Sequence, residues 1–102
     1  MSAEKHSFKA AIKTQHHKKH IVVTGKVEEP TNSWTVSLTK ANPQGINPKV
    51  LMLKLNEVPP KHAAGDIVTT YPVSFDESVG DHHHFTEVTI EAKGSSFTIP
   101  VH

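Results

Sequence analysis

The chain of 102 residues contains 35% hydrophobic and 21% charged residues, and its 11 basic and 10 acidic side chains give a formal net charge of +1. This balance excludes a disordered chain, which combines low hydrophobicity with high net charge, and predicts one globular domain over residues 1–102. The absence of cysteine excludes disulfides, thiolate nucleophiles and cysteine-based metal sites. Every basic residue is lysine, and without arginine, the usual side chain for bidentate phosphate and guanine contacts, we expect no nucleic-acid partner.

No apolar stretch approaches the roughly 18 residues that a membrane-spanning helix needs. The N-terminal stretch MSAEKHSFKAAIK carries charges throughout and has no signal-peptide core. We therefore expect no membrane partner and a cytoplasmic location.

Apolar residues recur at every second position in seven segments of the chain. In order, these segments are residues 8–12, 21–27, 34–38, 51–55, 67–75, 88–92 and 97–101. A period of two is typical of half-buried strands, and the many Thr, Val and Ile residues also favour strand over helix. Clusters rich in Pro, Gly, Asn and Ser, such as NPQGINP and VPPKHAAGD, separate the segments and predict turns.

Seven short strands in about 100 residues predict an immunoglobulin-like or fibronectin-type antiparallel β-sandwich. A jelly roll or a small β-barrel is the alternative. Trp34 heads the third segment, and we expect its indole to be a core anchor between the two sheets. Pro72 and Pro100 cannot donate ladder hydrogen bonds, so we expect their strands at sheet edges or at bulges.

The sequence offers no support for catalysis. Its glycines are too widely spaced for a dinucleotide fingerprint or a phosphate loop, and no serine stands in a nucleophile elbow. The acidic pairs at 28–29 and 76–77 lie at strand ends, where we expect them to face water and not to form a catalytic carboxylate pair. We therefore predict that the protein is not an enzyme.

The 9 histidines are the one compositional excess of the chain. In an extended GDHHHFTE segment, His82 and His84 would point to the same side, roughly 7 Å apart, which lets two imidazoles reach one ion. Glu87 is a candidate third ligand. Zinc, nickel and copper ions suit such imidazole-rich sites.

A second cluster, His16, His17 and His20, could complete this site if the two loops share one end of the sandwich. The opposing interpretation is an exposed turn that binds such ions weakly and without function. We therefore predict no bound cofactor, with a zinc, nickel or copper ion as the alternative.

The stretch HHHFTEVTIEAKG resembles part of the first metal-binding motif of cupins, in which a His-x-His pair precedes a glutamate and then a glycine. His82, His84, Glu87 and Gly94 match these positions in order. The resemblance implies a metal-dependent protein, either a cupin-like enzyme or a metal carrier.

The stretch EEPTNSW resembles a loop of the chagasin-type inhibitors of cysteine proteases. These inhibitors are immunoglobulin-like domains that use three loops at one end as a wedge. Pro30, Thr31 and Trp34 match the loop pattern. The resemblance implies a protease inhibitor.

The residues as a whole predict a non-catalytic binding or interaction module. We expect an unknown protein partner that binds the loops or an edge strand, and a homodimer formed through an edge strand is one such arrangement. A histidine-rich metal-binding protein and a protease inhibitor are the alternatives.

Overall fold

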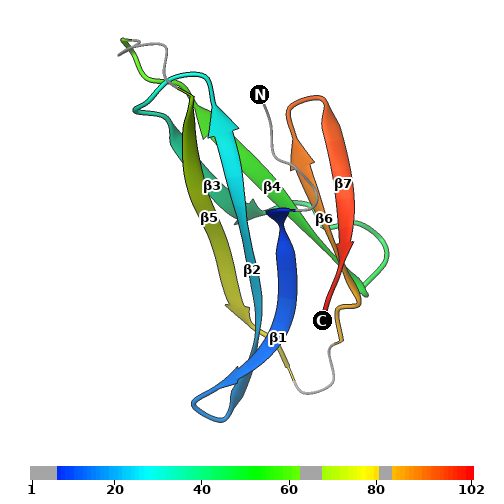
Figure 1. Ribbon diagram of the computed structural model, residues 1–102. Coiled ribbons are helices and arrows are strands. Elements are labelled where there is room, and N and C mark those ends of the chain that lie inside the picture. The colour runs from blue at the N-terminus through cyan, green and yellow to red at the C-terminus, as the bar shows by residue number, and fades with distance from the viewer. Residues whose placement is uncertain (1–6, 63–67, 81–83) are drawn as a thin grey trace.

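The computed structural model describes residues 7–62, 68–80 and 84–102. All seven elements in these ranges are strands, as the alternation of apolar residues predicts (Figure 1). They are β1 (Lys9–Gln15), β2 (Lys18–Glu29), β3 (Thr35–Lys40), β4 (Val50–Val58), β5 (Thr69–Ser78), β6 (Glu87–Ala92) and β7 (Ser95–Pro100). Among the described residues, no helix is both long enough and apolar enough to cross a membrane.

The strands form two sheets that pack face to face. One sheet has three strands in the order β1-β2-β5, and the other has four in the order β3-β4-β6-β7. The predicted all-β sandwich is therefore confirmed, and the two sheets do not close into a barrel. The expectation of a wholly antiparallel sandwich is wrong, because β4 and β6 run parallel while the other pairings are antiparallel. A period of two identifies the face that a residue occupies, but it carries no information about which strand lies alongside.

The core lies between the sheets and consists of the inward-facing members of each alternating segment. In β2 the odd-numbered positions from Ile21 to Glu29 are buried, whereas the even-numbered positions face outward. The buried apolar residues are Phe8, Ala10, Ile21, Val23, Val27, Leu38, Leu51, Leu53, Leu55, Val73, Val88, Ile90 and Ile99. Burial of these side chains is the main stabilising contribution that the sequence offers.

Both proline-containing strands lie at sheet edges, as predicted. Pro72 is in β5, the outermost strand of the three-stranded sheet, and Pro100 ends β7, the outermost strand of the four-stranded sheet. The edge of β1 is partly covered, because the His102 amide donates to the Ala10 carbonyl at 2.9 Å and the Ile12 amide donates to the His102 carbonyl at 3.1 Å. This contact joins the two sheets along one side.

Trp34 is not the core anchor that the sequence predicts. It precedes β3, is half-buried and lies outside the core cluster. Its indole Nε1 donates to Thr31 Oγ1 at 2.8 Å, and its amide donates to the hydroxyl of Tyr71 at 3.2 Å. A partner three residues away satisfies the indole N–H within the loop, so the ring belongs to the β2–β3 connection.

Phe8 connects the two sheets near the middle of the core. Its ring packs over Gly25 of β2, where a side-chain Cβ would overlap the ring. It also meets the ring of Phe97, from β7 of the other sheet, edge to face with centroids 5.4 Å apart. The glycine is therefore required by the close approach of an aromatic ring.

We expect Gly25→Ala to destabilise the protein by about 1–3 kcal/mol, because the added methyl group forces Phe8 or β2 to move. Urea unfolding measures the loss. Gly80→Ala is the matched control, since a Cβ there meets nothing within 4 Å. Equal stability of Gly25→Ala and the wild type would contradict the packing described.

Candidate functional site

The histidines of the first cluster lie on the hairpin that joins β1 to β2. His16 and His17 form its turn with φ values of 51° and 66°, and both are exposed. Two successive positive φ values are characteristic of the turns that suit the twist of a tight hairpin. His20 lies on the outward face of β2, where its Nδ1 is 2.8 Å from Oδ1 of Asp76. His16 and His17 thus lie in an exposed turn, whereas His20 lies on a strand in contact with a carboxylate.

The second cluster is only partly described. His82 lies outside the described residues, and His84 is exposed just before β6. Glu87 begins β6 and faces outward, because Val88 and Ile90 are the buried members of that strand. Within residues 7–62, 68–80 and 84–102, no group of three or more His, Cys, Asp or Glu side chains could hold a metal ion. The zinc, nickel or copper site stays a prediction of the sequence.

The end of β5 lies against the β1–β2 hairpin. The Val79 amide donates to the Lys19 carbonyl at 2.9 Å. A cavity of about 340 Å³, here called the hairpin hollow, is lined by His17, Lys18, Lys19, Ser78, Val79 and Gly80. Its lining contains cationic and hydroxyl groups and no carboxylate.

A second cavity opens on the outer surface of the three-stranded sheet. This central hollow has a volume of about 470 Å³ and is lined by Ser7, Lys9, Thr24, Gly25, Lys26, Pro72, Val73 and Ser74. Thr24 and Ser74 bring hydroxyl groups to its lining, and Lys9 and Lys26 bring ammonium groups. It too has hydroxyls and ammonium groups without a carboxylate.

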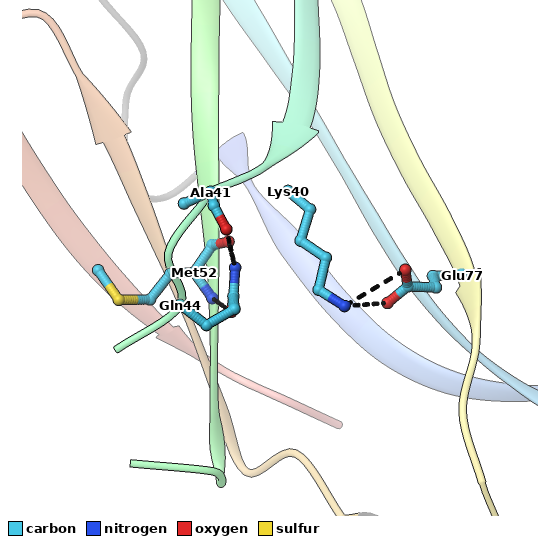
Figure 2. A network of polar contacts seen from close by, with 5 residues as sticks. All are labelled: Lys40, Ala41, Gln44, Met52 and Glu77. Carbon is cyan, nitrogen blue, oxygen red and sulfur yellow. Dashed lines mark hydrogen bonds and ion pairs between the residues drawn. The ribbon is translucent and has the colours of Figure 1, made fainter. Parts of the chain in front are cut away.

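The loop between β3 and β4 is held in place by the side chain of Gln44 (Figure 2). Its Nε2 donates to the carbonyls of Ala41 and Met52 at 2.6 and 2.8 Å, and its Oε1 accepts from the Met52 amide at 2.9 Å. The side-chain amide thereby pairs with both backbone groups of Met52, as a neighbouring strand residue would. Beyond this clamp, Ile46 is fully exposed.

Lys40 fixes the same end of β3 to the other sheet. Its Nζ lies 3.2 Å from Oε2 of Glu77, which belongs to β5, and both side chains are visible in Figure 2. The pair is exposed to solvent, so it adds little stability by itself. It does bring the open edges of β3 and β5 together.

Glu29 is a buried acid that the sequence reasoning missed. The expectation that the acidic pair at 28–29 faces water is wrong for this residue, which is 1% exposed at the end of β2. Its place in the alternation explains the burial, since it follows Ile21, Val23 and Val27 on the inward face. This odd-numbered position in the alternating segment is visible in the sequence and predicts the burial of Glu29.

The carboxyl group of Glu29 faces Glu57 of β4 across the interior. Burial, a hydrogen bond with the Glu57 side chain and the charge of Glu57 together raise the pKa of Glu29 to about 7, against a lowering effect of Lys93. A hydrogen bond between two carboxyl groups requires a proton on one of them. Glu29 Oε2 has no hydrogen-bond partner within the described residues.

Comparisons with known proteins identify no relative. No family model matches the chain, and neither the curated proteins nor the solved structures contain a significant match. The interpretation of the surfaces described above therefore depends on their geometry and chemistry.

We expect the stability of the protein to fall as the pH rises through the pKa of Glu29. The pKa is about 7 in the folded state against a reference value of 4.5, so the stability supplied by the protonated form is fully present below pH 4.5 and lost above pH 7. Glu29→Gln should remove this dependence, which amounts to roughly 3 kcal/mol between pH 4.5 and pH 8. Urea unfolding at both pH values measures it.

Glu28→Gln is the control for this experiment, because Glu28 is the exposed neighbour of Glu29 on the same strand. It should leave the difference between the two pH values as in the wild type. If Glu29→Gln and Glu28→Gln behave alike, the carboxyl pair of Glu29 and Glu57 does not govern the pH dependence.

We expect Gln44→Ala to loosen the β3–β4 loop, because the substitution removes three hydrogen bonds at once. The Met52 amide should exchange with solvent faster, and the fold should lose about 1–3 kcal/mol. Hydrogen exchange followed by NMR measures the first effect. Gln15→Ala, at the exposed end of β1, is the control, and an unchanged Met52 amide in Gln44→Ala would refute the clamp.

Proposed function

We propose that this chain is a non-catalytic interaction module of the immunoglobulin-like type that binds a protein partner through its β3–β4 loop. The observation that carries the proposal is the full exposure of Ile46 on a loop that Gln44 clamps to β4. An exposed aliphatic side chain gains free energy when a partner buries it. A loop already held in shape loses less conformational entropy on binding than a free one.

The arrangement of the strands supports the immunoglobulin-like part of the proposal. Two sheets of three and four strands make up the sandwich, and the smaller sheet joins the first, second and fifth strands. Immunoglobulin-like sandwiches likewise place their A, B and E strands in one sheet, to which the constant type adds strand D. The parallel pairing of β4 with β6 departs from that pattern, so the proposal describes a variant of it.

Recognition is assigned to a loop because three of the four edge strands, β1, β3 and β5, already make contacts within the chain. Residues 101 and 102 pair with β1, and Lys40 and Trp34 link the β3 side to β5. Addition of a further strand would have to displace these contacts. A homodimer through an edge strand stays the alternative, and it would not require Ile46.

We expect Ile46→Ser to weaken partner binding by about tenfold or more while the fold is retained, since removing a central apolar anchor has effects of this size. Wild-type and variant protein would be compared as baits in a cell extract by quantitative mass spectrometry. Each captured protein would then be purified and its affinity measured by calorimetry.

Val68→Ser is the matched control, because Val68 is also an exposed apolar residue, 54% accessible, outside this loop. A partner lost with Ile46→Ser and kept with Val68→Ser would support the proposal. Equal binding by all three proteins would overturn it. Concentration-dependent dimerisation that Ile46→Ser leaves intact would favour the edge-strand alternative.

A further inference from the structure

The outer face of the three-stranded sheet carries a row of lysines, and none of the strands in the described ranges packs on it. Its strands point Lys9 and Lys13 of β1 and Lys18 and Lys26 of β2 to the same side, and all four are exposed. This surface is called the lysine face below. Its outward positions are residues 9, 11, 13 and 15 of β1, the even positions from 18 to 28 of β2 and the even positions from 70 to 78 of β5.

The strand register arranges the four lysines as two diagonal pairs. Lys9 lies opposite Thr24, two residues from Lys26, and Lys13 lies opposite His20, two residues from Lys18. Diagonal neighbours of this kind stand roughly 7–8 Å apart. Lys9 and Lys13 are four positions apart on β1, roughly 13 Å, and Lys26 and Lys18 lie beyond them along the sheet, so the centres of the two pairs are roughly 20 Å apart.

Carboxylates do little to neutralise this row. The lysine face carries four lysines against two acids, which are Glu28 at its end and Asp76, whose Oδ1 lies 2.8 Å from Nδ1 of His20. The ion pairs shown within the described ranges are His20 with Asp76 and Lys40 with Glu77, and neither involves a lysine of the face. The four ammonium groups are therefore available to an external anion.

Each lysine pair lies beside a hollow that suits an anionic group. Lys9 and Lys26 flank the central hollow of about 470 Å³, which Thr24 and Ser74 supply with hydroxyl groups. Lys18 lines the hairpin hollow of about 340 Å³ with Lys19 and Ser78. Hydroxyl and ammonium donors without a carboxylate are the environment that sulfate, phosphate or carboxylate groups bind.

The repeated arrangement points to a linear ligand with recurring negative charges. Lys26 and Lys18 are eight residues apart on β2, which spans roughly 26 Å. A single small anion would occupy one hollow, whereas a chain of several charged units can contact both. Binding several weak sites at once raises the overall affinity above that of each site.

The chemistry of the face distinguishes among polyanions. Its outward positions hold no Phe, Tyr or Trp, and the chain has no arginine, so bases find neither stacking platforms nor guanidinium groups. The exposed large apolar residues among the described ones are Ile46, Val58 and Val68, and none belongs to this face. Insertion into a membrane thus has no anchor there.

We propose that the lysine face is a docking surface for a linear anionic polysaccharide, whose acidic groups would contact the two lysine pairs and whose hydroxyls would meet Thr24, Ser74 and Ser78. This surface belongs to a different sheet from the β3–β4 loop and does not depend on the protein partner proposed above.

Heparin is the probe for the test, at pH 8 and about 50 mM salt, where histidines are neutral and lysines dominate the attraction. Calorimetry should show binding by the wild type that weakens as salt is added. The double substitutions Lys9→Gln with Lys26→Gln and Lys13→Gln with Lys18→Gln should each weaken it by about tenfold or more. Melting temperatures verify that the variants fold.

Lys49→Gln with Lys54→Gln is the matched control, because it removes the same charge from the β3–β4 loop and the four-stranded sheet. It should leave heparin affinity within about twofold of the wild type, because salt screens the attraction between heparin and lysines that lie far from its binding surface. Absence of heparin binding, or an equal loss in this control, would overturn the proposal.

The competing classes of ligand are tested with the same proteins. Single-stranded DNA and phosphatidylserine vesicles should bind more weakly than heparin at matched charge concentration, and neutral dextran should not bind. Tighter binding of DNA or of vesicles through the same lysines would replace the polysaccharide with that ligand and overturn the assignment.

Discussion

The contact between the inward-facing apolar side chains of the two sheets is the constraint on which the rest of the structure depends. Because side chains alternate along a strand, burying Ile21, Val23 and Val27 on one face sends Lys18, Thr24 and Lys26 to the other. A shift of the register by one residue would exchange these sets and place lysines in the core. The same alternation therefore builds the core and the lysine face. Phe8 closes the packing between the sheets because Gly25 leaves room for its ring.

The same constraint explains the one buried acid of the described residues. Glu29 continues the inward series of β2, so it enters the interior at the end of the sandwich, where Glu57 of β4 approaches from the opposite sheet. Burial of Glu29 disfavours its charged form, and its hydrogen bond with the half-buried Glu57 requires a shared proton, so both effects raise the pKa of Glu29. The free energy of unfolding therefore depends on the protonation of Glu29. An apolar residue at this position would not make it depend on pH.

The surfaces proposed for binding differ in how the fold supports them. The β3–β4 loop is held by the Gln44 side chain, which bonds both backbone groups of Met52, and by backbone hydrogen bonds of Ala41 and Lys49, while Ile46 is exposed. The lysine face depends on strand register, because pairing of β1 with β2 fixes which lysines are neighbours. The loop is thus sensitive to a single substitution, whereas the face is a property of the whole sheet. Because the loop and the lysine face belong to different sheets, substitutions can change one binding surface and leave the other intact.

The sequence by itself determined that the chain forms seven strands, that their alternating apolar residues face inward and that Pro72 and Pro100 stand at sheet edges or bulges, because these follow from local periodicity and backbone chemistry. The sequence also indicated that Glu29 is buried, because Glu29 is an odd-numbered position on the same side of the strand as Ile21, Val23 and Val27. Only the tertiary structure decided that β4 and β6 are parallel, that Trp34 turns to Thr31 outside the core, and that Gln44 clamps a loop. The structure also showed that His20 contacts Asp76, whereas His16 and His17 form the turn of a hairpin. The β4–β6 pairing and the His20–Asp76 contact depend on which distant segments become neighbours, and a pattern that repeats every two residues is the same for any choice of neighbour. The Thr31 and Gln44 contacts depend on loop conformations, which a strand periodicity does not describe.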